Sequence, residues 1–407
     1  MAEEKGRTLK DARAGDPVAL ARALVATPSV NPEIEESGAG EAEVAELTAG
    51  WLRAWGLSVE MSEVAAGRWN VVGRLEGDGD GPTLLLNGHL DTVGVTGMTV
   101  EPFGGELQDG RLWGRGACDM KGGVAALLAA TAKVARDPLP GTLVVALTAD
   151  EEHASLGMES LVRSGMSADA AVICEPTGLA VMPAHKGFVW LEVAFRGRAA
   201  HGSRPDAGID AIEHAGHYLT ALGALRSRLR AGEPHPLLGH GSFHAGTIDG
   251  GSAPSVYPDV CRLVLERRTL PGEGAAGVVD EFQAILDDLA AVVPEFDAKL
   301  TQGLARPATE IRNDSPLVAG LLAACAAEGV DPMLAGMTAW VDAAFLNQAG
   351  TPSVCFGPGS IAQAHSADEW IECSEIVTCA AVLERFSHAF LQGDPGEMVT
   401  DVLAEAG

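Results

Sequence analysis

Four short apolar runs, each ending beside polar or charged residues, constrain the fold of this chain more than any other feature. Gly, Pro or acidic residues bound each run, and the runs are RWNVVGRL, PTLLLNGHLD, GTLVVALTAD and DAAVICEP. Such runs indicate strands of a largely buried sheet. The Ala-rich stretch GVAALLAATAKVARD between the second and third runs has helical spacing. Alternating strands and helices predict a three-layer α/β domain with a mostly parallel sheet.

The pattern changes after Pro183 and predicts a second, smaller domain. Two alternating runs and two amphipathic stretches follow in the order strand, helix, strand, helix, the last being a helix from Val278 to Val292. At 407 residues the chain exceeds the usual size of one domain. We therefore expect a two-layer α/β domain at 185–296, inserted into a larger domain made of 1–184 and 297–407.

The charge and hydropathy of the chain exclude several classes of protein. The formal net charge is −28, from 56 acidic and 28 basic residues, and such a field repels phosphate backbones, so we expect no nucleic-acid partner. No run of eighteen apolar residues occurs, and the opening MAEEKGRTLKDARAGD lacks the features of a secretory signal. Seven Cys residues include no CxxC pair, which favours reduced thiols. We expect a soluble, cytoplasmic protein without a membrane partner.

Two motifs place metal-binding side chains just after predicted strands. His89 can bind a metal through one ring nitrogen, while Asp91 fixes its tautomer through the other. Asp119 stands in the Gly-rich turn GRGACDMKGG before the Ala-rich helix, where a carboxylate can bridge two cations. A structural His–Asp hydrogen bond and a helix N-cap are the alternatives. A dinucleotide-binding turn is excluded because the Gly spacing differs and the later acidic partner is missing.

Three further segments add carboxylates and a second imidazole. The third strand ends in Asp150-Glu151-Glu152, where one glutamate can bind metal while its neighbour moves a proton. A solvated acidic turn is the alternative for these three residues. Glu175 follows the fourth strand, and His365 lies in GPGSIAQAHSADEW near the end of the chain. Nitrogen and oxygen ligands without thiolate suit zinc, cobalt or manganese.

Together these motifs resemble the zinc-dependent family of acetylornithine deacetylase, succinyl-diaminopimelate desuccinylase, aminoacylase and carboxypeptidase G. The resemblance spans essentially the whole chain. It implies that the inserted domain is ferredoxin-like and acts as a lid and as the contact of a homodimer. It also implies two divalent metal ions, zinc before cobalt or manganese, with Asp119 as the bridging ligand. The remaining implied ligands are His89 and Glu175 on one ion and Glu152 and His365 on the other.

The same resemblance assigns roles to residues that do not bind metal. It makes Glu151 the general base, Asp91 the partner of His89, and His201 in RAAHGSRPD an oxyanion donor from the inserted domain. Arg268 is implied to bind the substrate carboxylate, whereas we interpret the adjacent Arg267 as solvated. Many relatives have Asn in the Gly-Gly-x-x-Asn segment, but this chain reads GGSAPSVYP there, so it lacks that side-chain amide.

These observations predict a dizinc amidohydrolase that removes the acyl group from a small N-acyl-amino acid. The first alternative is an exopeptidase or dipeptidase that uses the same site on a short peptide. A non-catalytic metal-binding protein is the alternative from another class, although every ligand type and the base are present. A nicotinamide-dependent oxidoreductase would fit the α/β layout but lacks the phosphate-binding turn. The acyl group and the amino acid are not specified by these motifs.

Overall fold

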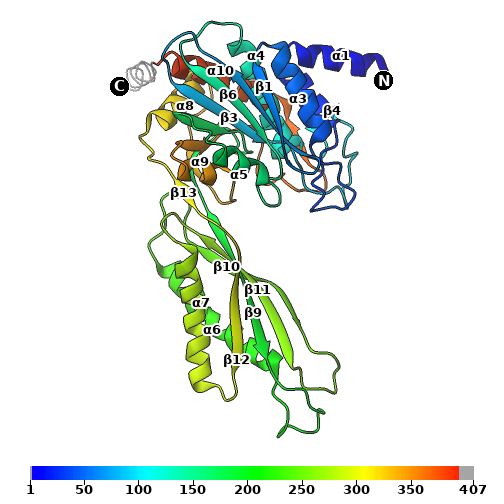
Figure 1. The fold of residues 1–407 in the computed structure, drawn as a ribbon, viewed down its shortest axis with the longest axis vertical. Helices are drawn as coiled ribbons and strands as arrows, with labels where there is room; N and C mark the ends of the chain where they lie inside the picture. Colours follow the sequence, from blue (N-terminus) through cyan, green and yellow to red (C-terminus); the bar gives the residue numbers. More distant parts are fainter. Residues whose placement is uncertain (1, 394–407) are drawn as a thin grey trace. The chain divides into compact units, whose positions relative to one another are not determined.

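The computed structural model describes residues 2–393, with side chains from Thr8 onward. The chain divides into two compact units (Figure 1). Unit 1 comprises Met1–Pro183, Ile311–Ala335 and Val341–Gly407, and unit 2 comprises Ala184–Glu310 and Gly336–Trp340. Among the described residues, no helix combines the length and the apolar character that crossing a membrane requires.

The sheet of unit 1 has a parallel centre and antiparallel edges. Strand β3 pairs in parallel with β6 and β7, and β7 pairs in parallel with β15. The edge pairs β1–β2, β2–β6 and β15–β8 are antiparallel. The mostly parallel sheet is therefore confirmed. In sheet order, the strands are β1 (Ser58–Ala65), β2 (Arg68–Leu75), β6 (Thr142–Thr148), β3 (Thr83–His89), β7 (Ala170–Ile173), β15 (Ser353–Cys355) and β8 (Val181–His185).

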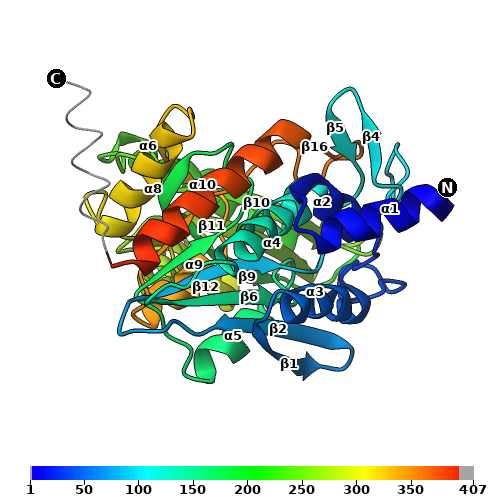
Figure 2. The ribbon, with the colours of Figure 1, turned by 90° about the horizontal axis from the view of Figure 1, so that it is seen from above.

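Helices cover both faces of this sheet, which confirms the predicted three layers (Figure 2). One face packs against α3 (Ala42–Ala54), α4 (Gly122–Val134) and α10 (Cys373–Leu391). The other face carries α5 (Leu156–Arg163) and α9 (Ala343–Gln348). The remaining helices of unit 1 are α1 (Ala2–Arg13), α2 (Pro17–Val25) and α8 (Pro316–Ala327).

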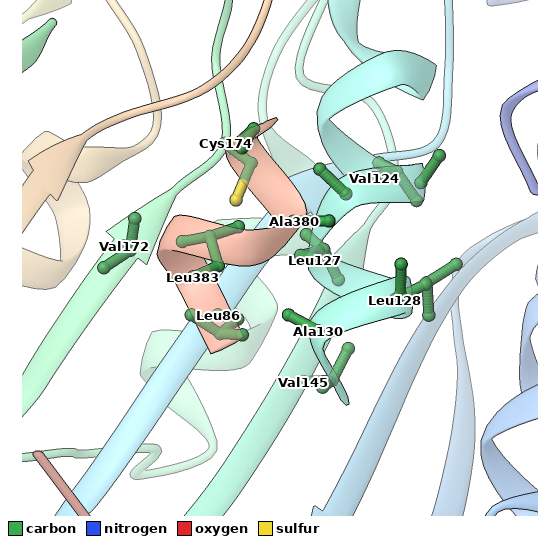
Figure 3. Close-up of a cluster of buried hydrophobic side chains, with 14 of the residues drawn as sticks. Leu86, Val124, Leu127, Leu128, Ala130, Val145, Val172, Cys174, Ala380 and Leu383 are labelled. Carbon is green, nitrogen blue, oxygen red and sulfur yellow. The ribbon is translucent and has the colours of Figure 1, made fainter. Parts of the chain in front are cut away.

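The core of unit 1 brings α4 very close to the central strands. Leu86, Val145 and Val172 from the sheet meet α4 and α10 in one apolar cluster (Figure 3). Gly123 at the start of α4 permits this approach, because a Cβ atom at that position would lie 1.9 Å from the Cys174 carbonyl oxygen. The turn that precedes α4, η1 (Ala117–Lys121), is thereby held at the carboxyl ends of β3 and β7.

A small antiparallel sheet joins two distant segments of unit 1. Its strands are β4 (Glu106–Gln108), β5 (Arg111–Trp113) and β16 (Trp370–Glu372), with β5 in the middle. Because β5 runs into the turn that carries Asp119, and β16 follows His365 closely, the sheet aligns these two segments. A late part of the chain is thus fixed beside an early one.

Unit 2 is a two-layer structure in which four antiparallel strands pack against two helices. The strands, in sheet order, are β10 (Ser242–Gly250), β11 (Val260–Thr269), β9 (Gly187–Arg196) and β12 (Asp297–Arg306). Helices α6 (Ala211–Ala231) and α7 (Ala275–Val292) supply the second layer and share its core with the sheet. Short strands β13 (Thr309–Glu310) and β14 (Leu334–Met337) lie where the chain passes between the units.

The second unit differs from the predicted block at 185–296 in its extent and in its strands. It continues to Glu310, because β12 pairs along the whole of β9 and completes the sheet. It takes in Gly336–Trp340 as well, which was predicted to belong to the larger domain. It also contains β10, for which the sequence predicted no strand. Nearly every residue of β10 is exposed, so this strand lacks the apolar alternation by which strands are recognised.

Candidate active site

The carboxyl ends of three neighbouring parallel strands bring the predicted side chains together. His89 ends β3 and lies opposite Thr148, the last residue of β6. Asp150, Glu151 and Glu152 follow β6, and Glu175 follows β7 by two residues. Parallel strands present their carboxyl ends at one edge of the sheet, which is where open α/β sheets bind ligands.

His89, Asp119, Glu152 and His365 form a compact cluster at this edge. The Asp119 carboxylate stands between the two imidazoles, with Oδ1 3.1 Å from His89 Nε2 and Oδ2 3.5 Å from His365 Nε2. His365 Nε2 also lies 3.0 Å from Glu152 Oε2. Ligand atoms of His89, Asp119 and Glu152 all lie within 4.8 Å of one another.

The donor set of this cluster suits divalent cations. It consists of imidazole nitrogens and carboxylate oxygens, which zinc, cobalt and manganese accept. Glu152 Oε1 is buried without a hydrogen-bond partner among the described residues. A buried carboxylate oxygen left in this condition costs free energy unless a cation or a proton compensates it. The residues present therefore fit a metal site.

The carboxylates of the site are buried close to one another, and both conditions raise their pKa values. Burial and the charge of Asp119 raise the pKa of Glu175 to about 8. Burial and the charge of Glu175 raise the pKa of Glu151 well above its usual value, and burial with Asp119 raises the pKa of Glu152. These shifts indicate a site that needs additional positive charge to hold all its carboxylates ionised.

The imidazoles supply part of that charge when they are protonated. Burial lowers the pKa of His89, but its hydrogen bond to Asp119 and the charge of Glu175 outweigh this effect, so the pKa is raised well above 6.5. A hydrogen bond to Glu152 raises the pKa of His365 to about 9, despite its burial. Burial raises the pKa of Asp119, but the hydrogen bond from His89 and the charges of both imidazoles and of Arg115 together outweigh it, so the pKa is lowered. Cations bound at these ligands would displace the protons.

Asp91 contacts His89 differently from the sequence prediction. The Nδ1–H of His89 donates to the backbone carbonyl of Asp91 at 2.9 Å, whereas the Asp91 Oδ1 atom is 3.7 Å away. The Asp91 carboxylate instead accepts the backbone N–H groups of Glu151 and Glu152 at 3.1 and 3.2 Å. A backbone carbonyl therefore fixes the tautomer of His89, while the Asp91 side chain positions the two glutamates.

A buried network behind Asp91 had no signal in the sequence. Arg68 makes two hydrogen bonds of 2.6 Å to Glu41 and lies 3.0 Å from Asp150 Oδ1. Asn31 Nδ2 donates to Asp91 at 2.8 Å and to Asp150 at 3.0 Å. These residues are far apart in the chain and gather only on folding. They fix the position of the segment that carries Glu151.

His201 and Arg268 belong to unit 2, so their roles toward the cluster in unit 1 remain predictions. His201 is exposed, and its Nδ1 accepts hydrogen bonds from the hydroxyl and the backbone N–H of Ser203 at 2.8 and 3.1 Å. Because Nδ1 is an acceptor, Nε2 carries the proton, as an oxyanion donor requires. Arg268 donates to the Thr338 carbonyl at 2.7 Å and lies over the Phe188 ring.

The interpretation of Arg267 as a solvated residue was wrong. Its side chain is 2% exposed and is paired with Glu273 at 2.7 Å, with Glu281 3.6 Å away. It also donates to the carbonyl oxygen of Arg268. The burial of alternate residues along β11 places Arg267 on the inner face with Leu263 and Leu265. Counting every second residue along the strand from these leucines is the signal that would have identified Arg267 as buried.

Similarity to known proteins identifies the family and the fold of the chain. The sequence profile of Peptidase family M20/M25/M40 matches residues 85–389. Acetylornithine deacetylase of Myxococcus xanthus is 33% identical over 353 residues, which cover 84% of this chain and 90% of that protein. A tripeptidase from Staphylococcus aureus has a similar structure, with a TM-score of 0.76 at 21% identity, covering 93% of this chain and 99% of the other. A Bacillus subtilis protein described as a dinuclear metal-binding peptidase has a TM-score of 0.71 at 18% identity, covering 94% and 99%.

Proposed function

The chain belongs to peptidase family M20/M25/M40, and we propose that it hydrolyses the amide bond of a small N-acyl-amino acid. The observation that carries this proposal is the buried cluster of two imidazoles and several carboxylates around Asp119. Relatives about 30% identical are named acetylornithine deacetylase, which supports a deacylase. The similar peptidase structures are 21% identical or less and support the fold alone.

Two divalent cations, with zinc as the first candidate, would be held by the four residues of the cluster together with Glu175. Asp119 would contact both ions, with His89 and Glu175 on one and Glu152 and His365 on the other. When bound, the two cations would polarise the scissile carbonyl and lower the pKa of an attacking water. The raised pKa values of Glu175 and Glu152 support this assignment, because uncompensated carboxylates would not be gathered here without cost.

Glu151 would be the general base of the reaction. Its side chain is close enough to Glu175 and His89 for their charges to alter its pKa, and Asp91 holds its backbone N–H in place. Glu151 would take the proton from the attacking water and return it to the nitrogen of the leaving amine. The Glu151 carboxylate would therefore accept and release one proton in each turnover and end in its starting protonation state.

His201 and Arg268 would complete the site from unit 2. The Nε2–H of His201 would donate to the oxyanion that forms as water attacks the carbonyl carbon. The Arg268 guanidinium would hold the substrate carboxylate with two hydrogen bonds and would thereby favour substrates that release an amino acid. We also propose a homodimer formed through unit 2 and a cytoplasmic location.

A metal-dependence assay with two classes of substrate tests this function. The purified protein is treated with a chelator, assayed on N-acetyl-amino acids and on dipeptides, and assayed again after addition of zinc or cobalt. We expect amine release from the N-acyl substrates that disappears with chelation and returns with metal. Faster cleavage of dipeptides would instead identify an exopeptidase, and stoichiometric metal with no turnover of either class would favour a binding protein.

A further inference from the structure

A second buried ion pair, Arg115 with Glu369, lies directly beneath the turn that carries Asp119. The Nη1 atom of Arg115 is 2.7 Å from Glu369 Oε2, and their side chains are 4% and 1% exposed. Neither residue belongs to the proposed ligands, to the base or to the groups that would contact substrate. Their burial next to the cluster therefore needs a separate explanation.

The Glu369 carboxylate gathers the backbone N–H groups of the Asp119 turn. Oε1 accepts from Cys118 at 2.8 Å and from Asp119 itself at 3.1 Å, and Oε2 accepts from Gly116 at 3.1 Å. Gly116 makes this geometry accessible, since its φ is +77° and a Cβ atom there would lie 2.6 Å from Thr92 Cγ2. Without the carboxylate, three buried N–H groups would lose their acceptor.

Arg115 extends the same contact to two other segments of the site. Its Nε atom donates to the Gly94 carbonyl at 2.9 Å, three residues after Asp91, and its Nη1 atom donates to the Ser366 carbonyl at 3.3 Å, next to His365. Glu369 itself lies four residues after His365. The pair therefore joins the segments that carry Asp91, Asp119 and His365.

We propose that Glu369, neutralised by Arg115, is a positioning residue that fixes Asp119 relative to His365 and thereby sets the affinity for divalent metal. The proposal rests on the proposed function, because it presupposes that these two residues are ligands. Glu369 acts through the backbone of Asp119 and touches neither metal nor substrate. Residues that orient ligands in this way typically contribute tenfold to a hundredfold to metal affinity.

The substitution Glu369→Gln tests this role with little change of shape. An amide keeps one acceptor oxygen and replaces the other with an NH₂ group. If the NH₂ group takes the place of Oε1, the N–H groups of Cys118 and Asp119 lose their acceptor. If it takes the place of Oε2, the Gly116 N–H and Arg115 lose theirs. The matched control is Glu372→Gln, on the same segment, which removes a carboxylate paired with Arg111 at the surface, 2.8 Å away. Metal-free protein is titrated with Co²⁺ alone and followed by its visible absorption, while thermal unfolding of each variant is measured separately.

We expect Co²⁺ to bind Glu369→Gln about ten to a hundred times more weakly than the wild-type protein, with an altered absorption spectrum. Excess metal should restore much of kcat and leave KM nearly unchanged, and Glu372→Gln should bind Co²⁺ normally. Wild-type Co²⁺ affinity in a folded Glu369→Gln variant, even one with a lowered unfolding temperature, would overturn the proposal and leave a purely structural pair.

A second variant guards against misfolding of the first. The double substitution Arg115→Gln with Glu369→Gln removes both charges together, so no buried charge is left unpaired. It should also bind Co²⁺ at least about tenfold more weakly, and unchanged affinity would again overturn the proposal. Failure of the wild-type protein to bind Co²⁺ would be a different result, because it would reject the proposed function along with this inference.

Discussion

Units 1 and 2 both bury arginine side chains but use them differently. In unit 2, Arg267 is matched by Glu273 and Glu281, and the carboxylates that pair with it keep partial contact with solvent. In unit 1, Arg68 and Arg115 hold carboxylates that are almost fully buried, and these in turn position a cluster whose acidic groups still repel one another.

This difference separates a structural ion pair from a functional one. The buried charge of unit 2 has two carboxylate partners within its own unit, although the Nε atom of Arg267 makes no hydrogen bond among the described residues. In the cluster of unit 1, burial and the closeness of other carboxylates raise the pKa values of Glu175 and Glu151. Strongly shifted pKa values gathered at the ends of strands are typical of functional sites rather than of structural ion pairs.

Removal of the central ligand should have the largest effect. Asp119→Ala takes away the carboxylate that stands between the two imidazoles, so both ions should be lost. We expect turnover to fall by on the order of 10⁴-fold or more, and metal analysis of the purified variant should find almost none bound. Two retained ions would show that Asp119 does not bridge them.

The second-largest effect is expected on the unfolding free energy, from the buried network around Arg68 in unit 1. Arg68→Met leaves Glu41 and Asp150 without their cation in a buried place, which we expect to cost about 3–5 kcal/mol of unfolding free energy. Denaturant unfolding of the metal-free protein measures this. A loss below about 1 kcal/mol, the size of a surface pair, would remove the distinction between the two units.

The pH dependence of metal binding should follow the raised pKa values. Glu175, with a pKa of about 8, and His365, at about 9, hold protons in the metal-free protein that a cation must displace. Metal affinity should therefore fall at least about tenfold for each pH unit between 8 and 6. The sign for metal-free stability is opposite, because both pKa values are raised on folding, and stability is lost as pH rises toward 8 and 9. Calorimetric titration and thermal unfolding at several pH values check both trends.

The smallest effect is expected for the structural pair of unit 2. Arg267→Met should lower unfolding free energy by about 1–2 kcal/mol, because its carboxylate partners can regain water. Metal content should not change, since the residue lies in a separate unit from the cluster. Loss of bound metal in the folded variant would show that the two units are not independent in this respect.

Candidate ligands could be located from the sequence, but the groups behind them could not. His89, Glu152 and Glu175 stand at or just after apolar runs, which indicated one edge of the sheet, while their roles as ligands come from the family resemblance and stay predictions. No local sequence pattern identifies Arg68 or Glu369, because each acts through a distant partner. Arg68 pairs with Glu41, 27 residues away, and Glu369 pairs with Arg115, 254 residues away. Ion pairs between distant residues produce no periodic pattern in the sequence.

Unit 2 was harder to predict for a different reason. Strand β10 is exposed along most of its length, so it carries no apolar alternation. Arg268 was assigned from the family resemblance and Arg267 was interpreted as its solvated neighbour, whereas the alternation of β11 places Arg267 on the buried face. Burial periodicity would have corrected the interpretation of Arg267 before the structure was known.

The central claim is that Glu151 moves a proton beside a metal cluster that it does not help to hold. The most direct test is Glu151→Gln, with metal content and turnover measured on the same preparation. We predict that both metal ions are retained while kcat falls by about 10²- to 10⁴-fold. Substantial activity in a fully metal-loaded Glu151→Gln variant would contradict the claim, and loss of the metal itself would reassign Glu151 as a ligand.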